Sequence, residues 1–225
     1  MLTKEDLAYV SSHLDFWEHL NEKEKEQLEK WMVKVSYKKG VNLHNSDEEC
    51  LGILLVRSGG MRVYILSEDG REVTLYRHSA GEVCVMSASC VLNCITFDVH
   101  IDAESDMEAY LIPSMVFRRM NEENIYVENY VYRNTVDRFS DVMWAMEQIL
   151  FMSIDKRLAI FLLDETTKNG TDSLKITQEQ IARYIGSARE VVSRMLKNFQ
   201  ADGLIEQSRG TIRILDKNRL KELTS

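Results

Sequence analysis

The chain has 225 residues, 44% hydrophobic and 28% charged, which is the balance of a folded globular protein and excludes a disordered one. No apolar run approaches the roughly 18 residues that a membrane span needs, and the first residues, MLTKEDLAYV, lack the apolar segment of a signal peptide. We therefore expect a cytoplasmic protein without a membrane partner. Its net charge of −8 counts against binding of an anionic partner unless the charge is unevenly distributed.

Charge is distributed unevenly along the chain. Residues 1–152 hold 15 Lys and Arg against 26 Asp and Glu, a net −11, whereas residues 153–225 hold 13 against 10, a net +3. An acidic N-terminal part followed by a mildly basic C-terminal part is compatible with a protein whose C-terminal end binds DNA.

The N-terminal half reads as short helices followed by a compact antiparallel barrel. Residues 4–35 have helical spacing of apolar side chains, and residues 37–112 alternate β-forming residues with glycine turns. The pair Asp69-Gly70, between RVYIL and EVTLY, predicts a hairpin with a two-residue turn, because Gly adopts the positive φ that such a turn needs. Pro113, the only proline, closes the strand region.

Residues 117–152 contain nothing that breaks a helix, so the sequence predicts one long helix. Its apolar residues fall on two stripes, so that one face could pack on the barrel and the other on a second copy of the chain. The alternative is a helix buried inside one monomer. We assign the dimer contact to the stripe that contains Val131, Val142, Ala145 and Ile149. Ser153 is a predicted N-cap that opens the amphipathic helix IDKRLAIFLLDET, and the polar stretch TKNGTDSLK is predicted to be a loop.

Two short helices joined by a glycine turn are predicted in TQEQIARYIGSAREVVSRMLKNFQADG. Thr177 with Gln180, and Ser187 with Glu190, have the spacing of capping boxes, and Gly186 separates the two helices. Helices joined by so short a turn cross steeply, as in a helix-turn-helix, and their shared core would hold Ile181, Ala182, Val192, Leu196 and Phe199.

The outer face of the second helix carries the residue types that read DNA. Arg donates two hydrogen bonds to guanine, Glu accepts a hydrogen bond from cytosine, and Ser donates a hydrogen bond to a phosphate. The following LIEQSRGTIRIL is predicted to form a hairpin wing. The predicted DNA-binding residues are Arg189, Glu190, Ser193 and Arg194, with Thr177, Gln178 and Ser187 beside them.

The chain resembles the cyclic-AMP receptor and fumarate-nitrate regulator (Crp/Fnr) superfamily of bacterial transcription factors over nearly its whole length. The matching blocks include LDFWEHLNEKEKEQLEKW, SEDGREVTLYRHSAGE, IDKRLAIFLL and ITQEQIARYIGSAREVVSRMLKNFQADGLIEQSRGTIRILD. The family's Arg-Glu-x-x-x-Arg reading motif falls on Arg189, Glu190 and Arg194, whereas its common Thr after the Glu is Val191 here.

The resemblance implies an α+β fold with a β-roll (jelly-roll) of the cyclic-nucleotide-binding type, a long dimerisation helix and a winged helix-turn-helix. The expected domains are a sensor at 1–116, the dimerisation helix at 117–152 and the DNA-binding domain at 153–225. It also implies a homodimer on a near-palindromic operator, contact with RNA polymerase, and a hinge at Ser153.

The sensor half departs from the cyclic-nucleotide pattern of the family. Residues 79–117 contain no Lys or Arg, and a cyclic phosphate buried without a cationic partner is costly. We therefore expect that cyclic AMP is not the effector. The effector pocket is assigned to Cys84, Met86, Ser87, Cys90 and Cys94.

Three interpretations of this sulfur-rich segment stay open. The cysteines can be small buried hydrophobes. Alternatively, GEVCVMSASC looks like the haem segment of carbon-monoxide sensors in the superfamily, although Ser87 replaces their ligating His, so that haem would need a Cys or His78. The third is thiol chemistry or an iron-sulfur cluster, although the cysteine spacing does not match the iron-sulfur members. The effector or cofactor is thus unknown, and no metal site is predicted.

Catalytic motifs are missing from the sequence: it has no GxSxG, HExxH, GxGxxG or P-loop, so we expect no enzymatic activity. The remaining alternative of a different class is a ligand-binding adaptor whose helix-turn-helix does not read DNA.

Overall fold

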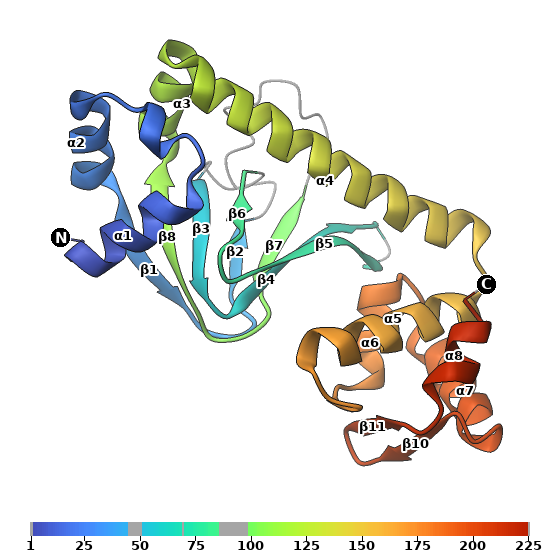
Figure 1. Ribbon diagram of the computed structural model, residues 1–225. Coiled ribbons are helices and arrows are strands. Elements are labelled where there is room, and N and C mark those ends of the chain that lie inside the picture. The colour runs from blue at the N-terminus through green and yellow to red at the C-terminus, as the bar shows by residue number, and fades with distance from the viewer. Residues whose placement is uncertain (1, 45–50, 69, 86–98, 225) are drawn as a thin grey trace. The chain divides into compact units, whose positions relative to one another are not determined.

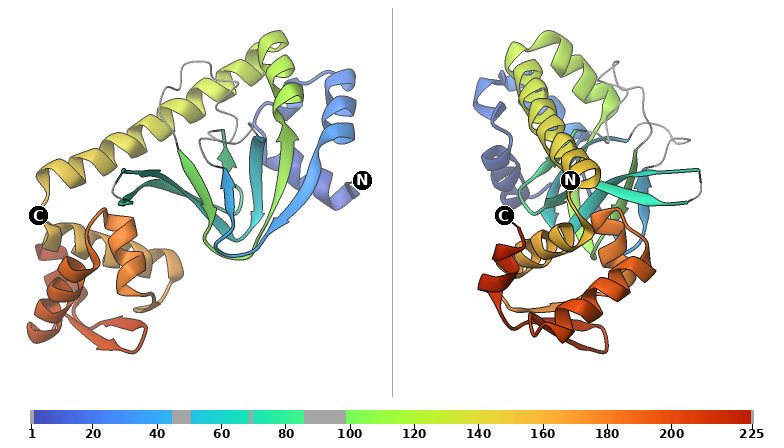
Figure 2. Two further views of the ribbon diagram at one scale, coloured as in Figure 1. Left: turned by 180° about the vertical axis from the view of Figure 1, so that it is seen from behind. Right: turned by 90° about the vertical axis from the view of Figure 1, so that its right-hand side faces the viewer.

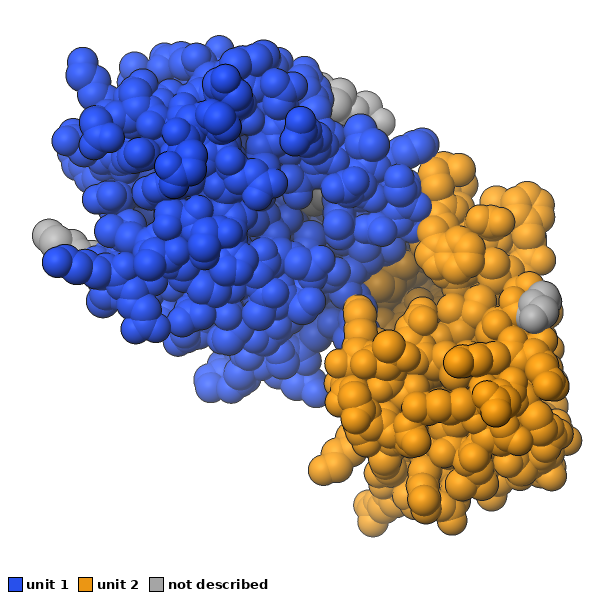
Figure 3. Space-filling view, viewed as in Figure 1, with its two compact units in different colours: residues 1–65, 75–142 blue, residues 66–74, 143–225 orange. Residues whose placement is uncertain are grey.

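The structure is a computed structural model that describes residues 2–44, 51–68, 70–85 and 99–224. The chain divides into two compact units, one of residues 1–65 and 75–142 and the other of residues 66–74 and 143–225 (Figure 3). The elements confirm the predicted α+β class (Figure 1). Among the described helices, none combines the length and apolar content needed to cross a membrane.

Unit 1 begins with helices, continues into strands and returns to helices. Its elements are α1 (Lys4–His13), the 3-10 helix η1 (Trp17–His19), α2 (Glu22–Trp31), β1 (Val33–Tyr37), β2 (Asn42–His44), β3 (Gly52–Ser58), β4 (Gly60–Leu66), β5 (Glu72–Ser79), β6 (Val83–Cys84), β7 (His100–Ala103), β8 (Met107–Pro113), α3 (Ser114–Glu123) and α4 (Ile125–Phe151). The last residues of β4 and α4 and the first of β5 are assigned to unit 2.

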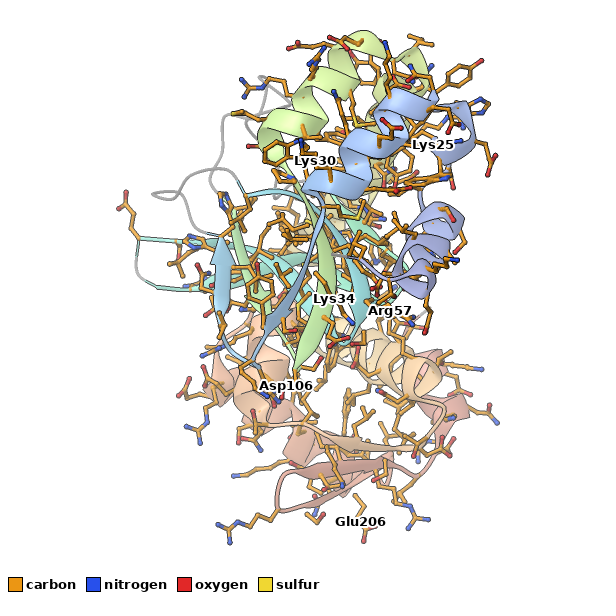
Figure 4. All side chains as sticks on the ribbon, turned by 90° about the vertical axis from the view of Figure 1, so that its left-hand side faces the viewer. Lys25, Lys30, Lys34, Arg57, Asp106 and Glu206 are labelled. Carbon is orange, nitrogen blue, oxygen red and sulfur yellow. The ribbon has the colours of Figure 1, made fainter. Side chains whose placement is uncertain are left out.

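The strands form two four-stranded antiparallel sheets with the orders β1-β8-β3-β6 and β2-β7-β4-β5. An ion pair of 3.1 Å joins Lys34 on β1 (labelled in Figure 4) to Glu108 on the neighbouring strand β8. The predicted antiparallel barrel is therefore present as a two-sheet roll.

β3 contributes to two hydrophobic cores at once. Ile53 and Leu55 belong to the core shared with the N-terminal helices, whereas Leu54 and Val56 belong to the core shared with the second sheet. Successive side chains of a strand point to opposite faces, so a strand covered on both sides is hydrophobic throughout. This accounts for the unbroken run ILLV.

The predicted hairpin joins β4 and β5, and its loop is longer than the two-residue turn expected. The Ser67 N–H donates to the Arg71 carbonyl oxygen at 2.9 Å, which closes the loop, and Gly70 has a φ of +79°. Asp69 lies outside the described residues. Gly70 thus has the positive φ that was predicted.

The predicted long helix is present as α4, but it begins at Ile125 instead of near residue 117, because the chain breaks at Asn124 between α3 and α4. Its backbone is extended, with φ −129° and ψ 110°. The Asn124 side chain donates to the His19 carbonyl oxygen and to Glu24, and its Oδ1 accepts from the Tyr126 N–H. These contacts stabilise a non-helical residue at the start of α4.

Unit 2 consists mainly of a helical bundle with a small sheet of order β10-β11-β9. Its further elements are α5 (Ile154–Asn169), β9 (Ser173–Lys175), α6 (Gln178–Ile185), α7 (Arg189–Ala201), β10 (Ile205–Ser208), β11 (Thr211–Ile214) and α8 (Lys217–Glu222). β10 and β11 form the predicted wing hairpin (Figure 2), and Arg213 and Glu206 pair across it at 3.8 Å. β9 lies in the stretch predicted to be a loop.

Candidate nucleic-acid interface

α6 begins at the predicted capping box. Thr177 Oγ1 accepts from the Gln180 N–H at 3.2 Å, and Gln180 Oε1 accepts from the Thr177 N–H at 3.0 Å, which confirms the box. The helix ends at Gly186, whose φ of +61° lies in the left-handed region that favours glycine. The turn from α6 to α7 is thus defined at both ends by local chemistry.

The apolar faces of α6 and α7 are buried in the core of unit 2, which confirms the predicted helix-turn-helix core. Its five predicted members are at most 4% exposed: Ile181, Ala182, Val192, Leu196 and Phe199. Complete burial of a side chain such as Leu196 contributes about 1.5–3 kcal/mol. This packing fixes which face of α7 points outward.

The outward face of α7 carries the predicted reading residues. Arg189, Glu190 and Arg194 are exposed, and Ser193 is half-buried. Within the described part of the chain, the three charged side chains form no ion pair with a neighbour. Two guanidinium groups and a carboxylate are therefore free to meet base edges, and they lie in the part of the helix that enters a groove first.

The predicted capping box of Ser187 with Glu190 is wrong. α7 begins one residue later than that box requires, its N-cap is Ala188, and no side chain caps it. Ser187 instead lies in the turn, where its N–H donates to the Ala182 carbonyl oxygen at 2.9 Å. Ala188 has no side-chain oxygen, so it cannot satisfy the first backbone N–H groups of α7.

The start of α6, the first residue of α7 and the wing line one groove with a volume of about 460 Å³. Its predicted members are Thr177, Gln178 and Arg189. Arg209 and Gln207 also line it and were missed by the sequence analysis. Arg209 is exposed in the turn between β10 and β11, and the Ser-Arg-Gly at the centre of the predicted wing was the signal that could have found it.

Hydrogen bonds connect the wing to the helices. Gln207 donates to Gln200 on α7 at 3.1 Å and accepts from Gln178 on α6 at 3.5 Å. The Ile176 N–H donates to the Gly210 carbonyl oxygen at 3.1 Å, which holds the wing turn near the start of α6. The three parts that line the groove are therefore held together by polar contacts.

Of the predicted effector residues, only Cys84 lies within the described part of the chain, where it is fully buried on β6. Met86, Ser87, Cys90 and Cys94 lie outside the described residues. Among those that are described, no group of three His, Cys, Asp or Glu side chains is arranged to hold a metal ion. The predicted effector pocket thus remains a prediction.

Ser153 is the N-cap residue of α5, as predicted, although its side chain makes no cap hydrogen bond. The Ser153 side chain bonds instead to Asp155, and this hydrogen bond is the main reason that the pKa of Asp155 lies below its ordinary value. The proposed hinge therefore lies at a helix boundary.

Of the four predicted dimer residues on α4, the structure contradicts one, Val131. Val131 is 3% exposed in the core of unit 1, so its side chain is not available to a second copy. Val142 is half-buried and packs partly against the core between the sheets. Ala145 is half-buried and Ile149 is exposed. The large exposed apolar side chains of the other stripe are Phe139, Met143, Met146 and Leu150.

Two family models match this chain. Residues 34–124 match the cyclic nucleotide-binding domain, and residues 156–223 match the Crp-like helix-turn-helix domain. The first covers the sheets and α3, and the second covers most of unit 2, including the groove described above.

Similar proteins support the same assignment over more than nine-tenths of the chain. A crystal structure of a Crp/Fnr-family regulator from Eubacterium rectale is 45% identical, covers 95% of this chain and 99% of its own, and superimposes with a TM-score of 0.91. The Electron transport regulator A of Shewanella oneidensis is 28% identical, with 91% of this chain and 84% of that protein covered. The Fumarate and nitrate reduction regulatory protein of Vibrio cholerae is 26% identical with the same coverage.

Proposed function

The chain belongs to the Crp/Fnr family of DNA-binding transcriptional regulators, and we propose on this premise that it acts as a homodimer that reads a near-palindromic operator. In this proposal α7 enters the major groove, the wing lies against the backbone, and an effector bound by the N-terminal half controls the DNA-binding end. Family membership also agrees with the expectation that the chain is not an enzyme.

The observation that carries the proposal is the placement of Arg189, Glu190 and Arg194 on one exposed face of α7. The core opposite fixes this face, so the three side chains reach outward from a rigid element. Each bidentate contact of an arginine with guanine would contribute about 1–3 kcal/mol of discrimination. The Arg209 guanidinium in the wing supplies a further cation for a phosphate.

The exposed apolar stripe on α4 supports the homodimer. Phe139 is 64% exposed and Leu150 is also 64% exposed, which is unusual for large apolar side chains unless a partner covers them. A second α4 packed against this stripe would cover them. Two recognition helices would then meet the duplex about one turn, ~34 Å, apart.

The proposed effector is a ligand other than cyclic AMP. The segment of residues 79–117 has no Lys or Arg with which to neutralise a cyclic phosphate. Binding of the effector would rotate the chain about the hinge at Ser153 and so change the position of α7. RNA polymerase contact follows from family likeness.

The experiment is fluorescence anisotropy with DNA from upstream of the protein's own gene, measured across a salt series. We expect sequence-specific binding whose affinity falls steeply with salt, because cations on the protein displace counterions from the phosphates. A shallow salt dependence with no preferred sequence would favour an adaptor that does not read DNA.

Two variants of α7 separate base reading from charge. Arg194→Ala should lose sequence preference and keep the dimer, since the guanidinium is assigned to a base. Lys197→Ala removes an exposed cation from the same helix. Any loss of affinity in this variant should be the same for all DNA sequences. Site selection by Arg194→Ala that matches the unchanged protein would refute the assignment.

A further inference from the structure

A cavity of about 530 Å³ lies in unit 1, apart from the predicted effector residues. It is lined by the end of α1 and the segment through η1, by the turn between β5 and β6, and by the first half of α4; Figure 1 labels α1, β5, β6 and α4. Its charged and titratable lining includes His78, Glu82, Arg133, Asp137 and Arg138. Neither the reading face of α7 nor the dimer stripe of α4 uses this cavity.

Buried polar atoms without partners gather at its inner wall. His78 is 3% exposed, and neither of its ring nitrogens has a hydrogen-bond partner among the described residues. Arg138 Nε is also buried without a partner in that part of the chain, as is the hydroxyl of Tyr76, which lies behind His78 and Arg138 and does not line the cavity. Unpaired polar groups are costly to bury, so a cluster of them indicates a ligand or ordered water.

These groups are close together. The His78 ring meets the Tyr76 ring edge-on at 5.4 Å between centroids, and the Arg138 guanidinium lies 5.2 Å from the centre of the Tyr76 ring. Arg138 Nη1 is paired with Asp141 at 2.9 Å, which fixes the guanidinium and leaves Nε unpaired. Tyr76 and His78 lie on β5, so a strand and a helix hold the cluster in place.

The charges around the cavity are mixed. Arg133 and Arg138 supply two cations, and Asp15, Glu82 and Asp137 supply three carboxylates. Glu82 is directed to the turn, where its Oε2 accepts from the Ser79 N–H at 2.7 Å and from Ser79 Oγ at 2.8 Å. The carboxylates would repel a simple anion, and the guanidinium groups would repel a simple cation.

Two further histidines face the cavity, and both are held by other contacts. His13 stacks on Tyr9, and its Nδ1 lies 2.8 Å from the Tyr9 carbonyl oxygen. His19 stacks on Tyr126 with the ring centroids 3.8 Å apart. These rings, with Phe16 and Tyr130, add flat apolar surface to the polar wall.

We infer that this cavity binds a zwitterionic small molecule, a free amino acid or a close derivative, as an effector of the chain. The carboxylate lies against His78, Arg133 and Arg138, and the ammonium group lies toward Asp15 and Asp137. This inference deepens the proposed function, because it names the chemical class of the regulator's ligand.

Burial, followed by the charge of Arg138, lowers the pKa of His78 to about 4, so the imidazole is neutral near pH 7. A neutral imidazole donates one hydrogen bond and accepts another, and a bound carboxylate can take the donated one. The same carboxylate would raise the pKa of His78, since it favours the charged ring.

The experiment uses the full chain and each of the twenty L-amino acids as probes, in thermal shift followed by isothermal titration calorimetry. Each probe is compared with its N-acetyl form, which lacks the ammonium group, and with its amide, which lacks the carboxylate. We expect at least one free amino acid to bind and both blocked forms of it to lose binding. Failure of all twenty to bind, or equal binding of a blocked form, would overturn the inference.

Variants test the position of the site. His78→Phe removes the unpaired nitrogens and keeps an aromatic ring, so the unliganded protein should stay folded while amino-acid binding weakens roughly tenfold or more. Arg133→Gln at the edge of the cavity should also weaken binding, and Arg119→Gln on α3 is the matched control. Unchanged affinity in both His78→Phe and Arg133→Gln would contradict the placement.

DNA binding is measured in parallel by anisotropy. A chain that reads DNA and binds none of the probes would refute this inference alone. A chain that binds an amino acid and reads no DNA would refute the proposed function alone.

Discussion

Arg157 on α5 donates a hydrogen bond of 2.8 Å from Nη1 to the carbonyl oxygen of Ile185, the last residue of α6. The carbonyl groups at a helix C-terminus have no partner within the helix, and a cation is favourable there. This contact ties the end of α6, just before the turn into the recognition helix, to α5.

Replacement of Arg157 with Met should destabilise unit 2 by about 1–3 kcal/mol, because the Ile185 carbonyl loses a charged donor. The measurement is the unfolding transition of the full chain by calorimetry or denaturant. Arg209→Met, at an exposed position in the wing turn, is the control and should leave the transition unchanged. Equal stability of the two variants would show that the Arg157 contact contributes nothing.

Replacement of Tyr110 with Phe should raise the pKa of Asp6. The hydrogen bond from Tyr110, at 2.7 Å, is the largest cause that lowers the pKa of Asp6 to about 2, followed by hydrogen bonds from Thr3. A lowered carboxyl pKa contributes stability that is complete above the unfolded value of 3.8 and is lost as the pH falls to about 2. Carbon-13 NMR titration of Asp6 measures the pKa directly, and the stability of the variant should depend less on pH in this window.

Replacement of Phe139 with Glu should dissociate the proposed dimer. An unpaired carboxylate buried between two α4 helices is costly, so we expect the dissociation constant to rise by roughly two orders of magnitude. Sedimentation velocity measures the change. Met115→Glu makes the same chemical change at another exposed apolar residue, on α3, and should keep the dimer. A Phe139→Glu protein that remains a dimer would place the interface elsewhere.

Replacement of Gly186 with Ala should impair DNA binding more than it impairs folding. Gly186 and Gly170 both follow a helix with φ near +60°, so the backbone strain of Ala should cost about 1–2 kcal/mol of stability at either position. At Gly186 the added Cβ would also lie 3.3 Å from Ile149, whereas at Gly170 it would meet no neighbour. Only Gly186 precedes α7, so only Gly186→Ala should also shift the reading face and lower the affinity for DNA. Equal DNA affinities in the two variants would contradict this role of the turn.

Local chemistry made the helix-turn-helix predictable. The box of Thr177 with Gln180 and the glycine at 186 are short-range signals, and the period of the apolar residues identified the buried face of α6 and α7. The second box failed because spacing alone does not fix where a helix starts. Ala188 takes the N-cap position although Ser187 has the better side chain for it.

The long helix and its two faces depend on contacts between distant residues. Asn124 breaks the helix because it bonds to groups near residues 19 and 24, which no local pattern reveals. The apolar period of α4 shows two stripes, and it does not show which residues pack inward; the burial of Val131 is visible only in the folded chain. The cavity beside His78 was missed for the same reason, since β5 and α4 are far apart in sequence.

The uncapped start of α7 at Ala188 presents main-chain N–H groups that side-chain substitution leaves in place. The first N–H groups of α7 point out of its N-terminus, carry the positive end of the helix dipole, and bind a phosphate well. Alanine substitution removes side chains and leaves those amides in place. Even when all the reading side chains of α7 are replaced by alanine, a weak affinity for DNA that does not depend on sequence should therefore remain. Only a change of the backbone, such as proline within the first turn, would reduce it further.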